Sequence, residues 1–105
     1  MRIRWTPAAA ADLQQISDYL RDHHPQYREP SLRRMYSSIQ SLKEWPHRGR
    51  VGREEGTREL LFLPLPYIAV YRLKEQSVEV LRVYHAAQDR PAGADRLAGG
   101  GQRCA

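Results

Sequence analysis

The sequence is poor in the residues that build disulfides and metal sites. Its single cysteine, Cys104, lies near the end of the chain and cannot form an internal disulfide. The histidines and this cysteine do not follow the spacing of zinc ligands. We therefore expect a fold that needs neither a disulfide nor a metal ion, and we expect no cofactor.

Long hydrophobic runs are also absent. No apolar run approaches the roughly 18 residues that a membrane-spanning helix needs. Asp12 and two glutamines interrupt the N-terminal apolar stretch, so no signal-peptide core is predicted and we expect a cytoplasmic protein. The length of 105 residues predicts one domain over residues 1–90. Residues 91–105 form a Gly- and Ala-rich tail, expected to be a short helix or disordered.

Lysine is scarce in a chain that is otherwise basic. Lys and Arg total 17 against 12 acidic residues, for a net charge of +5, yet Lys43 and Lys74 are the only lysines. The planar fork of arginine suits carboxylates and phosphates better than a lysine does. The charge favours an anionic partner, either nucleic acid or an acidic protein. The alternative is that the charge merely aids solubility.

The N-terminal half contains one strand pattern and two helix patterns. Residues 2–5 alternate basic and apolar side chains, which predicts a short strand. Thr6 and Pro7 provide an N-cap and a first-turn proline for an amphipathic helix over residues 7–22, with Asp12 on its polar face. The segment "HHPQYREP" is expected to interrupt the helical pattern before a second helix. Its predicted apolar stripe comprises Leu32, Met35, Tyr36, Ile39 and Leu42.

The C-terminal half predicts strands over residues 58–63, 67–73 and 77–84, preceded by an exposed basic loop at 47–58. The strand around Leu81 is apolar on both faces, which indicates a central strand. The predicted fold class is α+β with the order β-α-α-β-β-β. Its helical hairpin packs on a mostly antiparallel sheet, because only that arrangement buries both apolar stripes.

Five segments, in this order and spacing, resemble the ParE/RelE superfamily of bacterial toxins from type II toxin–antitoxin modules. They are "WTPAAAADLQQISDYL" at 5–20, "SIQSLKEWPHRGR" at 38–50, "GTRELL" at 56–61, "YIAVYR" at 67–72 and "VLRVYHAAQD" at 80–89. The resemblance implies a RelE/ParE-like toxin fold and a cognate antitoxin that forms a hetero-oligomer with the toxin. It also implies one of two targets. ParE-like members inhibit DNA gyrase without acting as nucleases, and RelE-like members cleave mRNA on the ribosome.

The nuclease alternative needs an acid or base and cations for the phosphate charge. His85 could serve as acid or base, and Arg58 and Arg82 could stabilise phosphate. Each has a structural alternative. His85 could cap a strand end, Arg58 could pair with Glu59 or Glu79 or contact the antitoxin, and Arg82 could be held in an ion pair.

The sequence departs from the nuclease branch at the strand that begins with Tyr67. RelE-like enzymes typically have an arginine directly after this tyrosine, where this chain has Ile68. The ending "VYHAAQD" resembles the ParE-like ending instead, with Gln88 where an arginine is common. We therefore favour a ParE-like gyrase inhibitor in which His85 is structural. A toxin that has lost its activity is a further alternative. The candidate contacts for target or antitoxin are Arg48, Arg50, Arg53 and Arg58.

Overall fold

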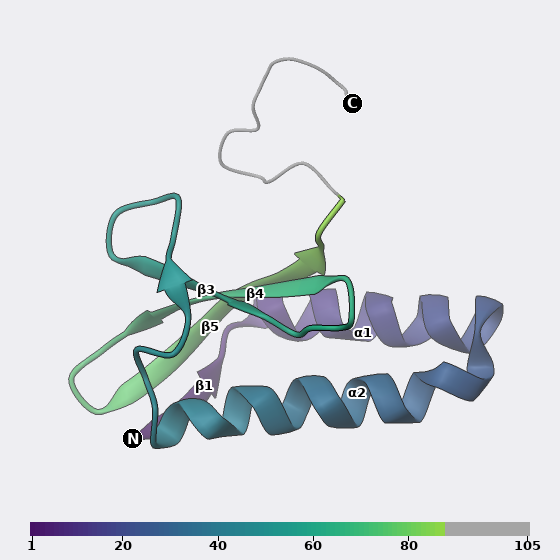
Figure 1. The fold of residues 1–105 in the computed structure, drawn as a ribbon, viewed down its shortest axis with the longest axis horizontal. Helices are drawn as coiled ribbons and strands as arrows, with labels where there is room; N and C mark the ends of the chain where they lie inside the picture. The colour runs from purple at the N-terminus through teal and green to yellow at the C-terminus, as the bar shows by residue number, and fades with distance from the viewer. Residues whose placement is uncertain (88–105) are drawn as a thin grey trace, which may run out of the picture.

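The structure of this chain, a computed structural model, describes residues 1–87 and contains a helical hairpin and a five-stranded sheet (Figure 1). In chain order the elements are β1 (Arg2–Trp5), α1 (Pro7–His23), α2 (Pro25–Gln40), the 3-10 helix η1 (Ser41–Lys43), β2 (Arg50–Val51), β3 (Thr57–Leu61), β4 (Tyr67–Leu73) and β5 (Ser77–His85). The predicted α+β fold of two helices on a mostly antiparallel sheet is confirmed. The predicted tail at 91–105 lies outside the described residues.

The sheet has the strand order β1-β5-β4-β3-β2, and only β1 and β5 are parallel. β5 is therefore a central strand, as its apolar sequence predicted. β1 pairs with only the first part of β5, from Ser77 to Val80. Beyond that point α1 lines the same edge, because the amide of Val83 donates to the Asp12 carboxylate at 2.9 Å. The helix thus replaces a strand partner for the second half of β5.

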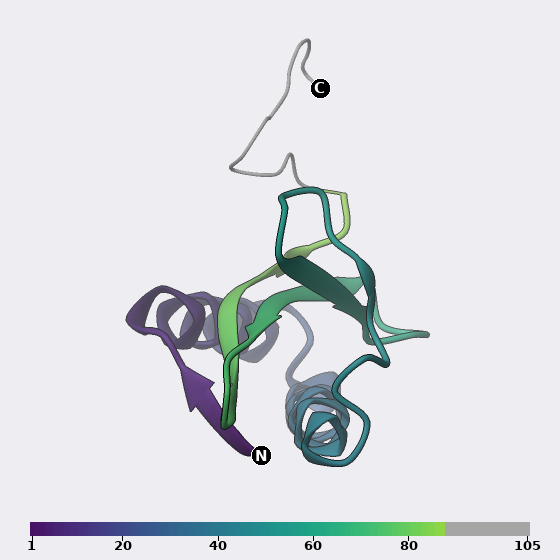
Figure 2. The same ribbon diagram turned by 90° about the vertical axis from the view of Figure 1, so that its left-hand side faces the viewer.

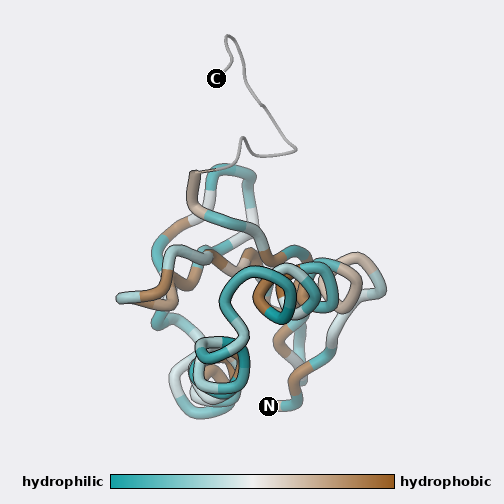
Figure 3. Tube along the Cα trace, turned by 90° about the vertical axis from the view of Figure 1, so that its right-hand side faces the viewer, coloured by the Kyte–Doolittle hydropathy of each residue, from teal (hydrophilic) through white to brown (hydrophobic). Residues whose placement is uncertain are grey.

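One hydrophobic core joins the sheet to both helices. Viewed along the hairpin, α1 and α2 lie beside each other against the curved sheet (Figure 2), and hydrophobic segments of the sheet and the helices face one another (Figure 3). The core includes Ala9, Met35, Ile39, Leu42, Leu60, Phe62, Ala69, Tyr71, Val78, Val80 and Val83. Tyr67, Tyr71 and Tyr84 are all buried.

The predicted start of the second helix was wrong. The helices are separated by a single residue, His24, and α2 begins at Pro25 and passes through Pro30. Proline is favourable at the first helical position, where its missing N–H is not needed, and Pro30 removes one bond close to the helix start. Arg28 also holds this first part of α2 to α1 by donating to the Ser17 hydroxyl at 3.0 Å. The "HHPQYREP" segment therefore continues the hairpin.

Three further expectations need correction. Tyr36 is 55% exposed and does not belong to the buried stripe of α2. Residues 47–58 are not entirely a loop, because β2 pairs there with β3. The predicted strands at 58–63 and 77–84 run over 57–61 and 77–85. A two-residue strand carries no periodic pattern, so β2 could not be recognised from local sequence.

Candidate functional site

A groove of about 780 Å³ lies between the helical hairpin and the sheet. It is lined by α1, the start of α2, the β3–β4 turn and the ends of β4 and β5. Its aromatic and imidazole side chains are Tyr19, His24, Tyr27, Tyr67, Tyr84 and His85. We name this surface the hairpin groove. Because most of its lining is apolar or aromatic with polar tips, it suits an amphipathic partner better than a small charged ligand.

Arg82 lines the hairpin groove but is engaged with α1. Its Nε and Nη2 atoms donate to the two carboxylate oxygens of Asp12 at 2.7 and 3.0 Å. This hydrogen-bonded carboxylate raises the pKa of Arg82, although burial opposes the effect. Asp12 is itself buried. The sequence had placed Asp12 on the polar face of α1, and the structure corrects this because the carboxylate also bonds the edge of β5.

His85 closes the end of β5. Its Nδ1 atom accepts a hydrogen bond from the amide of Ala87 at 3.0 Å. The imidazole also meets the Tyr67 ring edge-on, with 5.3 Å between ring centroids. Burial, followed by the proximity of Tyr19, raises the pKa of Tyr67, so this tyrosine is protonated at neutral pH. These two contacts are those of a residue that shapes a strand end.

Arg58 contacts the segment between η1 and β2 and does not line the hairpin groove. Its guanidinium donates to the carbonyl oxygens of Gly49 at 2.9 Å and His47 at 3.2 Å. The expected pairing of Arg58 with Glu59 or Glu79 is wrong within residues 1–87, where Arg50 pairs with Glu59 and Arg4 and Arg72 pair with Glu79. Arg82 and His85 line the hairpin groove and Arg58 does not. The three nuclease candidates therefore do not line one common pocket.

The hydroxyl of Tyr71 fixes the segment that Arg58 contacts. This side chain is fully buried, donates to the carbonyl of Pro46 at 2.8 Å and accepts from the amide of Gly49 at 2.9 Å. A Cβ atom at position 49 would lie 2.7 Å from the Tyr71 hydroxyl oxygen, so only glycine fits this close approach. The sequence interpretation missed this role because Tyr71 reads locally as an ordinary core aromatic.

The proposed arginine contacts differ in their surroundings. Arg50 donates two hydrogen bonds to Glu59, at 3.0 and 2.8 Å, so its charge is matched by a carboxylate. Arg48 instead donates to the hydroxyl of Ser41 at 2.6 Å, and Arg53 is exposed. The contacts of these residues with a target or an antitoxin stay a prediction. Arg48 and Arg53 are the better placed of the three, because neither forms an ion pair within residues 1–87.

Neither a metal site nor a membrane helix is found in the described part of the chain. Residues 1–87 contain no group of three or more His, Cys, Asp or Glu side chains that could hold a metal ion. Neither of their helices combines the length and apolar character required to cross a bilayer.

Comparison with known proteins shows where this fold and its segments recur. A family described as "ParE toxin of type II toxin-antitoxin system, parDE" matches residues 3–90. The chain is 39% identical to Y4kP of Sinorhizobium fredii, which bears a toxin's name, over 86% of this chain and 93% of that protein. It is 34% identical to Toxin RelE2 of Caulobacter vibrioides, over 83% of this chain and 97% of that protein.

Two solved structures share the fold. A chain of the chromosomal ParDE toxin–antitoxin system from P. aeruginosa superposes with a TM-score of 0.74 at 26% identity, covering 81% of this chain and 95% of that one. A copper-bound mutant toxin from Helicobacter pylori gives a TM-score of 0.57 at 16% identity, covering 81% and 93%, and shows the fold alone. Since the family match spans nearly all of residues 1–90, this chain belongs to the ParE family of toxins of type II toxin–antitoxin systems.

Proposed function

We propose that this chain is a toxin that inhibits DNA gyrase by binding it, without cleaving nucleic acid, and that a cognate antitoxin neutralises it. The family match over residues 3–90 supports the toxin role. The separation of Arg58 from the hairpin groove, which Arg82 and His85 both line, supports the non-nuclease branch. Arg82 is bound by Asp12, His85 accepts a backbone hydrogen bond, and Arg58 holds backbone carbonyls. That separation is the observation that carries the choice between the two targets.

The hairpin groove is the proposed binding site of the antitoxin. A groove lined by apolar and aromatic side chains accepts the apolar face of an amphipathic helix. The related structure from P. aeruginosa comes from a ParDE toxin–antitoxin system, which supports a partner of this kind. Because the net charge of the chain is +5, an acidic antitoxin is favoured, and its association should weaken with salt.

The second candidate function is mRNA cleavage on the ribosome. The relative named Toxin RelE2 favours it, since this chain covers 97% of that protein at 34% identity. Ile68 argues against it, because this residue is buried where the nuclease branch typically has an arginine. Cleavage through His85, Arg58 and Arg82 would require a rearrangement that brings Arg58 to the hairpin groove.

The test is to induce the gene in a bacterial host while following uptake of labelled thymidine and labelled methionine together. We expect DNA synthesis to fall first. In parallel, the purified protein should block supercoiling by DNA gyrase, and added antitoxin should restore it. A toxin that leaves gyrase untouched at stoichiometric excess, while methionine uptake falls first, would establish the translation target instead.

A further inference from the structure

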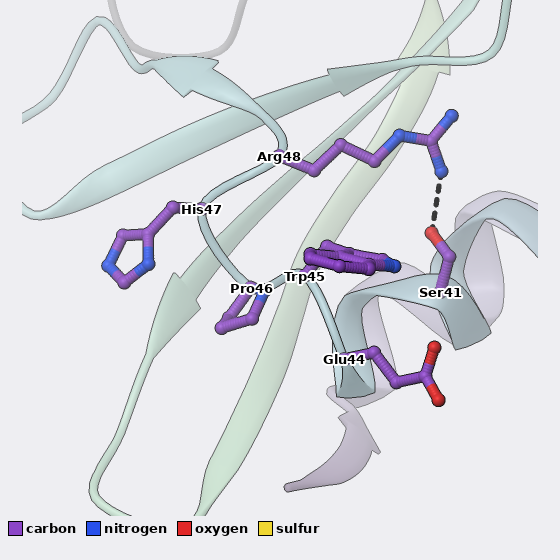
Figure 4. Close-up of a pocket in the computed structure, with 6 residues that line it drawn as sticks. All are labelled: Ser41, Glu44, Trp45, Pro46, His47 and Arg48. Atoms are coloured by element: carbon purple, nitrogen blue, oxygen red, sulfur yellow. Dashed lines mark hydrogen bonds between the residues drawn. The ribbon is translucent and has the colours of Figure 1, made fainter.

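Trp45 is an exposed tryptophan on the segment that follows the helical hairpin. Trp45 is 64% exposed, whereas tryptophan residues are highly buried on average. It lines a depression of about 800 Å³ together with Ser41, Glu44, Pro46, His47 and Arg48. In Figure 4 the indole lies between the side chains of Arg48 and Glu44, while His47 points away from it. We name residues 45–48 the Trp45 loop.

The backbone of the Trp45 loop is fixed at both ends. The amide of Trp45 donates to the carbonyl of Ser41 at 3.0 Å, an α-type bond that ties Trp45 to the start of η1. The amide of Arg48 donates to the carbonyl of Trp45 at 3.0 Å, closing a tight turn. Beneath this turn, the buried Tyr71 hydroxyl accepts from Gly49 and donates to Pro46. The exposed indole is therefore held by a preorganised backbone, which lowers the entropy lost when a partner binds.

Arg48 of the loop and Arg58, which contacts it, are not neutralised by a carboxylate of the described residues. Arg48 donates to a hydroxyl, and Arg58 donates to two carbonyls. Neither forms an ion pair with a carboxylate of residues 1–87. By contrast, the sheet arginines Arg50, Arg72 and Arg82 each contact a buried or nearly buried carboxylate. Arg48 therefore has a positive charge beside the exposed indole that is not held in an ion pair within residues 1–87, and this charge can meet a carboxylate of a partner.

We propose that the Trp45 loop docks on the protein that this toxin inhibits, with Trp45 filling an apolar recess and Arg48 facing a carboxylate. The proposal rests on the proposed function in requiring a protein target. A protein is favoured over nucleic acid because the depression pairs one arginine with a glutamate, whereas binding a phosphate backbone calls for several clustered positive charges. Tryptophan and arginine are also the side chains that most often dominate the binding energy of protein interfaces.

The Trp45 loop and the hairpin groove are separate surfaces. They have no lining residue in common, and they are built at different places along the helices. The groove has a mostly apolar and aromatic lining that suits an amphipathic segment, whereas the loop presents an exposed indole with charged neighbours. We therefore assign the loop to the target and the groove to the antitoxin, which makes the two kinds of binding separable by mutation.

The experiment compares Trp45→Ala with Tyr36→Ala, an equally simple loss of an exposed aromatic side chain. Tyr36 lies on α2, is 55% exposed and does not line the depression. Each variant is tested for growth arrest, for inhibition of gyrase supercoiling and for binding to the cognate antitoxin. We expect Trp45→Ala to weaken growth arrest and gyrase inhibition by at least about tenfold, as for an interface hot spot, with antitoxin binding unchanged. Trp45→Phe should recover part of the inhibition.

The outcomes separate the two proposals. If the wild-type toxin does not inhibit gyrase, the proposed function fails. The role of the loop is then still tested by comparing the growth arrest caused by Trp45→Ala with that caused by Tyr36→Ala. Equal growth arrest by both variants would overturn the role of Trp45. A loss of antitoxin binding that matches the loss of inhibition would make the loop an antitoxin surface. Saturable quenching of tryptophan fluorescence by a single-stranded oligonucleotide, present in the wild type and absent in Trp45→Ala, which retains only Trp5, would overturn the choice of a protein partner.

Discussion

The carboxylate of Asp12 holds the guanidinium of Arg82 by two hydrogen bonds across 70 residues of sequence. The same carboxylate accepts the amide of Val83, so it joins α1 both to a side chain and to the backbone of β5. This arrangement explains why an arginine interrupts the apolar run from Val80 to Tyr84 in β5. Arg82 is part of the junction between the helical hairpin and the sheet.

Replacing Asp12 with alanine should destabilise the fold. The change leaves the Val83 amide without its acceptor and Arg82 without its carboxylate, at a cost of about 2–4 kcal/mol in the free energy of unfolding. Urea denaturation measures this cost. The control is Asp18→Ala, because Asp18 has a 44% exposed side chain and pairs with Arg21 on the surface. Equal effects of the two substitutions would contradict the structural role of Asp12.

Replacing Tyr71 with phenylalanine should loosen the Trp45 loop while keeping the core filled. The lost hydroxyl leaves the Gly49 amide and the Pro46 carbonyl without their partner, which costs about 1–3 kcal/mol. Amide hydrogen exchange measures the effect locally, and protection at Gly49 should fall more than protection in α1. Tyr36→Phe, at an exposed position, is the matched control. Unchanged exchange at Gly49 would show that the hydroxyl does not hold the loop.

Glu79 should make the stability of the fold depend on pH. A hydrogen bond from Arg72 is the main cause that lowers the pKa of Glu79 from its ordinary value of 4.5; burial opposes this, and the charges of Arg72, Lys74 and Arg4 add to it. Because the pKa is lower in the folded state, this stabilisation is present above pH 4.5 and is lost as the pH falls through the folded-state pKa.

The measurement is the free energy of unfolding of wild type and Glu79→Gln between neutral and acidic pH. The advantage of the wild type should be largest above the unfolded-state pKa and should shrink as the medium is acidified. In an Arg72→Ala background the same comparison should lose much of its pH dependence, because the main partner is gone. A difference that stays constant across the titration would refute the linkage.

Substitution of His85 by alanine should leave growth arrest intact. The residue accepts the Ala87 amide and packs against Tyr67, so its loss should cost stability of about 1 kcal/mol rather than activity. Growth arrest at matched protein levels checks this, together with thermal unfolding. For the same measurements on Arg82, Arg82→Lys is a better variant than Arg82→Ala, because lysine keeps a positive charge beside Asp12. Loss of toxicity in a folded His85→Ala protein would revive the nuclease alternative.

Local patterns were sufficient to predict the overall fold. The Thr6–Pro7 helix start, the apolar face of α1 and the three long strands depend on neighbouring residues, and periodicity reports such features directly. The order of the five family segments predicted the toxin fold before any contact was known, and the family match confirmed it. Trp45 lies within one of these segments, at 38–50, but nothing in the local sequence indicated that its side chain is exposed.

Only the tertiary structure decided which charged groups and hydroxyls are engaged in hydrogen bonds or ion pairs within the fold. Asp12 meets Arg82, Tyr71 meets Gly49, and Arg58 meets His47, each pair brought together by chain segments that are distant in sequence. Such pairs leave no periodic pattern in the sequence. Which donor meets which acceptor depends on strand pairing and on the place where α1 replaces β1 beside β5. The sequence by itself determined the first helix, the three long strands and the family, and packing between distant segments determined which residues remain available to a partner.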